Sequence, residues 1–161
     1  MAILKDKKAQ NHIIELLTKA YWMEIETVMS YIANSVNLDG VRAKEIKNSL
    51  KADITEELGH AQQFAARIKV LYGEVPGSMQ FKAEQTYLQP PKDHSDVPTV
   101  IRGVIKAEQG AIDHYNEVIA YCEEHDDPVT ADMVTTILAD EQSPLREFEG
   151  FLKEYEDATK K

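Results

Sequence analysis

The chain is short of cysteine and contains no long apolar run. Its 161 residues include a single cysteine, Cys122, which excludes an intrachain disulfide framework and any zinc or iron–sulfur site built from four thiolates. No run of about 18 apolar residues occurs, so the sequence predicts no transmembrane helix. Residues 1–8 also lack the apolar centre of a signal peptide. We therefore expect a cytoplasmic protein with no membrane partner.

Positive charge is scarce as well. Lys and Arg total 18 against 28 Asp and Glu, which gives a formal net charge of −10 at pH 7. Such a chain repels phosphate backbones, so the composition argues against a nucleic-acid partner, despite a small basic arm at Lys5, Lys7 and Lys8. The 43% of hydrophobic residues is enough for a buried core, and the length fits one domain over residues 1–161.

Four long segments show apolar residues at spacings of three and four, the pattern of amphipathic helices. They cover about residues 6–35, 41–72, 99–123 and 129–155, and Gly73 follows the second as a helix stop. Residues 73–98 contain four prolines and can return the chain along a helix of about 42 Å. The sequence therefore predicts an all-α four-helix bundle, made of two helical hairpins joined by a long crossover.

An internal repeat relates the two hairpins. Displacing the sequence by 84 residues superposes acidic and aromatic residues of matching type: Glu24 on Glu108, Tyr31 on Tyr115, Glu56 on Asp140 and Glu57 on Glu141. Apolar positions follow the same register, with Phe64 on Phe148 as one example. A repeat of this kind reflects architecture, so the two hairpins are expected to be versions of one unit.

Four glutamates of this repeat lie among apolar residues: Glu24, Glu57, Glu108 and Glu141. Carboxylates that face one core repel each other and lose hydration, so a bound cation or partial protonation is needed. His60 lies three residues after Glu57 on the same helical face, where it adds an imidazole to a metal site. This ligand set suits iron, with manganese and zinc as alternatives. The other four histidines lack such spacing, and we expect them to be solvated: His12, His94, His114 and His125.

The motifs at residues 24–31, 56–60, 106–108 and 137–141 resemble the ferritin-like di-iron carboxylate family, and its bacterioferritin and mini-ferritin branches in particular. The resemblance covers residues 13–155. It implies that Glu57 and Glu141 bridge two irons, that Glu24 and His60 complete the first iron, and that Glu108 serves the second.

The same resemblance assigns groups around the metals. It implies that Asp140 pairs with His60 and that Glu56 takes the matching place beside the second site. Tyr31 and Tyr115 have two interpretations. They are either plain core aromatics, or they hydrogen-bond to a bridging carboxylate or donate an electron near the metals.

The sequence departs from the family pattern at Pro144, where the repeat and the family both place the histidine partner of Glu141. Proline offers no ligand atom, and inside a helix it costs about 3 kcal/mol and usually produces a kink. We therefore expect an asymmetric pair of sites, with a weak or displaced second site. Leu58 stands where haem-binding members have methionine, which argues against haem. The short fifth helix of larger cages is not expected either.

The leading hypothesis is a protein that binds Fe(II) and oxidises it with dioxygen or peroxide, in iron handling or oxidant defence. We expect a homo-oligomer, either a dimer or a cage. Two alternatives stay open. One is a non-catalytic binding or assembly bundle with one structural metal or a decayed site. The other is a peroxide-reducing enzyme like the rubrerythrins, although the chain has no cysteine-rich electron-transfer domain.

Overall fold

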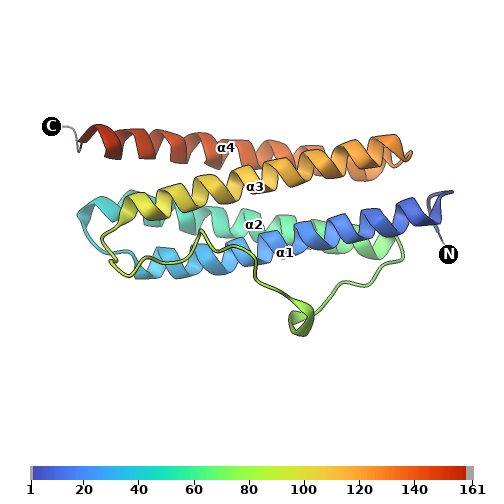
Figure 1. Cartoon of the computed structure of the whole chain (residues 1–161), viewed down its shortest axis with the longest axis horizontal. Coiled ribbons are helices and arrows are strands. Elements are labelled where there is room, and N and C mark those ends of the chain that lie inside the picture. Colours follow the sequence, from blue (N-terminus) through green and yellow to red (C-terminus); the bar gives the residue numbers. More distant parts are fainter. Residues whose placement is uncertain (1, 159–161) are drawn as a thin grey trace.

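Four long helices form the molecule (Figure 1). The structure, a computed structural model, describes residues 2–158. The helices are α1 (Lys7–Asn37), α2 (Lys44–Val70), α3 (Val97–Glu124) and α4 (Pro128–Ala158), with two short 3₁₀ helices, η1 (Val41–Ala43) and η2 (Ser78–Gln80). No strand occurs within residues 2–158. The prediction of an all-α bundle of two helical hairpins is confirmed.

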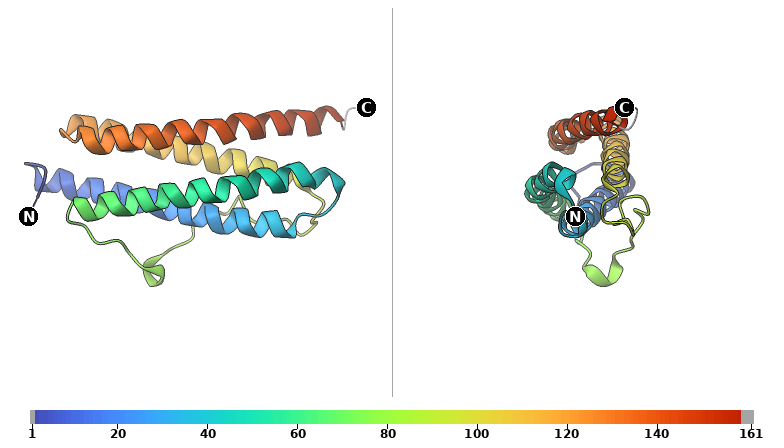
Figure 2. Two further views of the ribbon diagram at one scale, coloured as in Figure 1. Left: turned by 180° about the vertical axis from the view of Figure 1, so that it is seen from behind. Right: turned by 90° about the vertical axis from the view of Figure 1, so that its left-hand side faces the viewer.

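The crossover, residues 71–96, determines how the hairpins combine. α1 packs along α2, and α3 packs along α4. The crossover runs back along the bundle, so that α3 begins near the end where α1 finishes (Figures 1 and 2). As a result α1 and α3 lie antiparallel and in contact. This arrangement brings the middle of all four helices to one level.

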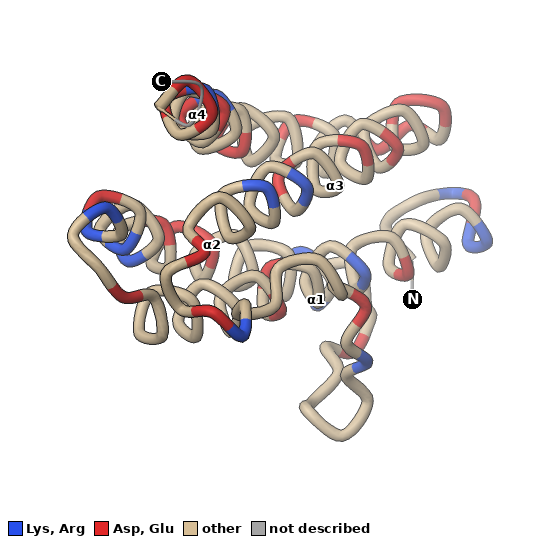
Figure 3. The backbone as a smooth tube through the Cα atoms, turned by 60° about the vertical axis from the view of Figure 1, so that its left-hand side comes forward, with Lys and Arg blue, Asp and Glu red and all other residues tan. Residues whose placement is uncertain are grey.

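Two apolar clusters fill the bundle on either side of that level. One contains Leu17, Phe64 and Tyr115, and the other contains Tyr31 and Phe148. Acidic residues are spread over all four helices (Figure 3). In residues 2–158 no helix is both long enough and apolar enough to cross a bilayer.

The end of α2 differs slightly from the prediction. Tyr72, not Gly73, takes the left-handed conformation, with φ 63°. The Gly73 N–H donates to Ile68 O at 2.9 Å and the Tyr72 N–H donates to Lys69 O at 3.1 Å, which is a Schellman end. Gly73 is needed for space, because a Cβ there would lie 2.9 Å from Ile14 Cγ2.

Pro144 disturbs α4 less than the sequence indicated. The helix is continuous from residue 128 to residue 158, and Pro144 is buried within it. Only the N–H of residue 144 is lost to the helix. Position 144 therefore stays on the inward face that also carries Glu141.

The crossover lies close against α1 and α3. Asn34 Nδ2 donates to Leu88 O at 3.0 Å, and Leu88 is buried. Gly103 of α3 permits this approach, since a Cβ there would lie 2.7 Å from Tyr87 O and 3.3 Å from Leu88 Cα. Both of those obstacles are backbone atoms, so the whole segment would have to move.

We expect Gly103→Ala to lower the free energy of unfolding by about 1–3 kcal/mol, because overpacking displaces the crossover. Gly150→Ala is the matched control, since a Cβ at this exposed α4 position meets only Arg146 Nη1 at 3.6 Å. The control should gain about 0.5–1 kcal/mol through helix propensity. Urea unfolding of both variants measures the two free energies of unfolding. An equal gain in stability from both substitutions would show that the crossover does not lie close against Gly103.

Candidate metal centre

The five residues predicted to bind metal come together in the core. Glu24 comes from α1, Glu57 and His60 from α2, Glu108 from α3, and Glu141 from α4. Each is at most 3% exposed. They lie between the two apolar clusters, where water cannot screen their charges.

Four of the five form one compact group. Glu24, Glu57, His60 and Glu141 each present one ligand atom, and these atoms all lie within 4.8 Å of one another. His60 Nδ1 is 3.0 Å from Glu141 Oε1 and 3.8 Å from Glu24 Oε1. Glu108 lies outside this group, although its carboxyl contacts that of Glu141. The compact group includes both residues that the sequence analysis assigned to the first metal.

The outer nitrogen of His60 has the predicted partner. His60 Nε2 lies 3.2 Å from Asp140 Oδ2 across the bundle. A hydrogen on Nε2 leaves the Nδ1 lone pair facing the carboxylates, which is the tautomer that a metal requires. Glu56 is exposed and forms a second cluster with His60 and Asp140, with ligand atoms within 4.8 Å.

The two tyrosines are more than core aromatics. Tyr31 donates its hydroxyl hydrogen to Glu108 Oε1, and Tyr115 donates to Glu24 Oε1. These partners differ from Glu57 and Glu141, the pair that the resemblance makes bridges. Burial and the neighbouring carboxylates raise both phenol pKa values, which keeps the hydroxyls protonated as donors.

Burial dominates the electrostatics of the carboxyls. Desolvation, followed by repulsion from the other glutamates, raises the pKa of Glu57 and Glu108 well above the usual range and that of Glu141 to about 9. The carboxyl of Glu57 lies against that of Glu24, and the carboxyl of Glu108 lies against that of Glu141. Without a cation, Glu57, Glu108 and Glu141 therefore hold protons at pH 7.

The arrangement fits a bound metal. His60 Nδ1, Glu108 Oε2 and Glu141 Oε1 are buried and make no hydrogen bond within the described chain. Buried polar atoms are normally satisfied, so these three need a shared proton or a cation between them. A cavity of about 10 Å³ lies against all four glutamates, with room for about one water-sized group.

Asp53 is a neighbour of the site that sequence reasoning missed. Ser49 of α2 contacts Glu147 at 3.2 Å, and His60 contacts Asp140, so Asp53 lies level with residues 144–147 of α4. Its Oδ2 is buried and unpartnered among residues 2–158, and burial raises its pKa to about 6. The available signal was its position four residues before Glu57, on the same helical face.

One of the four histidines expected to be solvated is not. His114 is buried, and its Nε2 lies 3.0 Å from Leu16 O. His114 is buried because it lies on the side of α3 that faces α1. It is not part of the compact glutamate group. That expectation is wrong for His114.

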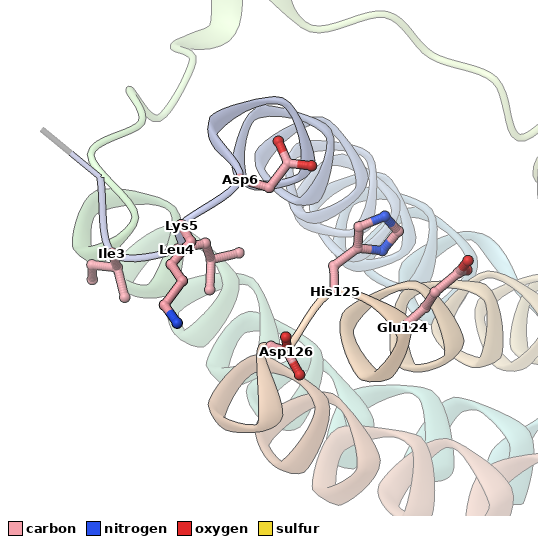
Figure 4. A pocket seen from close by; sticks show the side chains of 7 residues that line it. All are labelled: Ile3, Leu4, Lys5, Asp6, Glu124, His125 and Asp126. Carbon is pink, nitrogen blue, oxygen red and sulfur yellow. The ribbon is translucent and has the colours of Figure 1, made fainter.

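A surface pocket at one end of the bundle is separate from this centre. A pocket of about 470 Å³ lies at one end of the bundle, lined by residues 3–6 and 124–126 (Figure 4). Glu124 follows Glu108 by 16 residues, or about 24 Å of helix. The acidic residues that line the pocket, Asp6, Glu124 and Asp126, are exposed, unlike the glutamates of the core.

Comparison with known proteins agrees with this geometry. Residues 14–158 match the ferritin-like domain. The chain belongs to the ferritin-like family. The bacterioferritin of Desulfovibrio desulfuricans is 30% identical over 146 residues, which cover 91% of this chain and 76% of that protein. The family resemblance drawn from the motifs is confirmed.

Solved structures give the same result. The crystal structure of Desulfovibrio desulfuricans bacterioferritin, described as showing its diiron site in different catalytic states, matches with a TM-score of 0.80 and 27% identity over 93% of this chain and 83% of that one. A ferritin-like diiron-carboxylate protein from Bacillus anthracis str. Ames also gives 0.80, at 19% identity over 91% and 99% of the two chains. The second match is a likeness of fold.

The raised pKa values predict an unusual pH dependence for the metal-free protein. Unfolded glutamates titrate near 4.3, whereas Glu141 in the folded protein titrates at about 9, so the folded state binds more protons between these limits. We expect the free energy of unfolding to fall by about 2–4 kcal/mol between pH 5.5 and 8.5. Denaturant unfolding in a chelator measures it. Glu141→Gln should flatten the slope, and stability that rises with pH would contradict the electrostatic account.

Proposed function

We propose that the protein binds Fe(II) at this centre and oxidises it, as a ferroxidase in iron handling or oxidant defence. The observation that carries the proposal is the convergence of four buried carboxylates, from all four helices, around one small cavity, with the His60 imidazole grouped with three of them. Oxygen and imidazole donors suit iron. The diiron site described for the similar bacterioferritin supports iron over manganese or zinc.

Fe(II) is the substrate in this proposal. Glu24, Glu57, His60 and Glu141 would hold the first ion, and Glu108 would hold the second with help from Glu57 and Glu141. The carboxyl protons leave as the cations arrive, because a nearby positive charge stabilises the ionised carboxylates. Asp140 accepts a hydrogen from His60 Nε2 and so keeps Nδ1 free to bind.

The electron balance needs two irons for each oxidant. Each Fe(II) gives up one electron, and dioxygen takes two electrons and two protons and leaves as hydrogen peroxide. With peroxide as the oxidant, two electrons and two protons give two waters. Tyr31 and Tyr115 hold Glu108 and Glu24 in place from the opposite helices, which keeps the site preorganised.

One observation favours a second candidate, a bundle that holds a single metal without turnover. The compact ligand group contains four residues, and Glu108 lies outside it. Pro144 supplies no ligand atom for a second ion. Metal count and oxygen uptake separate the two candidates.

Anaerobic Fe(II) titration of the metal-free protein, followed by exposure to air, tests the proposal. We expect one tightly bound iron per chain, weaker binding of a second, and oxygen uptake above that of buffer. Glu57→Gln should reduce uptake at least tenfold, because it removes a buried ligand. The control Glu45→Gln changes an exposed carboxylate of the same helix, outside the centre, and should retain most of the uptake. A wild-type protein without oxygen uptake would overturn the ferroxidase proposal.

Pro144→His tests the asymmetry directly. Because α4 is continuous, a histidine at position 144 would follow Glu141 by three residues and lie on the same helical face. We expect the second iron to bind about 10–100-fold more tightly than in the wild type. Pro144→Ala is the control, since it restores the helix N–H without adding a ligand. Equal second-site affinity in the two variants would show that the missing histidine is not the cause.

A further inference from the structure

Gln85 of the crossover lines the cavity beside the glutamates and is 6% exposed. The four helices supply the rest of the lining, which includes the polar residues Thr27 and Tyr115, whose hydroxyls already make hydrogen bonds. Ala107 and Ala111 leave space on the α3 side. His60 does not line this cavity, so Gln85 covers the face of the centre that lies away from the imidazole.

The crossover holds Gln85 in this position by buried hydrogen bonds. Glu26 of α1, itself 6% exposed, accepts the N–H of Glu84 at 2.9 Å and the N–H of Gln85 at 2.6 Å through Oε1. The Gln85 carbonyl oxygen accepts from Gln89 Nε2 at 2.7 Å. Hydrogen bonds therefore hold both the backbone N–H and the backbone carbonyl of Gln85.

The Gln85 amide is oriented with its oxygen unused. Gln85 Nε2 donates to Thr27 Oγ1 at 2.9 Å. Gln85 Oε1 is buried and has no hydrogen-bond partner in the described structure. A buried amide oxygen without a partner is uncommon, and amide oxygens are good ligands for hard divalent cations.

We propose that Gln85 is the ligand that an incoming divalent cation meets at the α1–α3 side of the centre, before the glutamates bind it. This role rests on the proposed function, because it requires that the glutamates take up a metal. The neutral Gln85 oxygen replaces one water of the cation's hydration shell but binds the cation only weakly. The cation then passes to the carboxylates, whose negative charge binds it more strongly.

Co(II) binding measured by stopped-flow absorbance tests this role without any oxidation step. We expect Gln85→Met to slow the binding rate about tenfold, the size of effect that follows from loss of one polar contact to a charged group. The equilibrium stoichiometry should not change, because the five core ligands are intact. Gln85→Glu keeps an oxygen at the same place and should bind at least as fast as the wild type.

Gln80→Met is the matched control, because it removes an exposed amide from the same segment, outside the cavity and without a contact to Gln85. Its rate should stay within about twofold of the wild type. Equal rates in Gln85→Met and wild type would overturn the proposal. Equal slowing in Gln85→Met, Gln85→Glu and Gln80→Met would also overturn it, since a general disturbance of the crossover would then be the cause.

The outcome separates this proposal from the proposed function. Normal Co(II) uptake with no effect at Gln85 contradicts only the role of Gln85. Absence of oxygen uptake with Fe(II), together with a slow Gln85→Met variant, contradicts only the ferroxidase activity. Absence of Co(II) binding to the wild type would overturn both.

Discussion

The burial of four carboxylates at one level of the bundle is the constraint on which the rest of the structure depends. Neither apolar cluster can extend through this level, so the core is divided in two. Charged groups without water or a partner would destabilise the fold, and shared protons or a cation are the available remedies. The tyrosine hydroxyls donate to one oxygen each of Glu108 and Glu24, and Asp140 pairs with the outer nitrogen of His60.

The crossover is part of this solution as well as a connection. It places a peptide segment over the α1–α3 face, where Glu26 and Asn34 receive or donate buried hydrogen bonds. Gly103 provides the room that this approach needs. A centre made only of four helices would be open on that side, and the segment at Gln85 closes it with a polar atom.

The two halves of the repeat differ at one position of the candidate metal centre. The first half keeps His60, and its group of four ligand atoms is compact. The second half has Pro144, and α4 nevertheless stays continuous because the proline removes one N–H from a helix that packs along α3 over its length. Asp53 faces the same level from α2, so a carboxylate stands near the place where an imidazole is missing.

The sequence by itself determined the four helices and the five buried residues of the candidate metal centre, because these follow from helical periodicity and from the repeat that relates the two hairpins. The family resemblance added the Asp140 partner of His60. The sequence did not determine which carboxylate each tyrosine reaches, the burial of His114, or the positions of Asp53 and Gln85. Those depend on the rotation and level of one helix against another, and on a crossover with no periodicity to read. Only side-chain packing across the whole bundle fixes them, so the tertiary structure alone decided them.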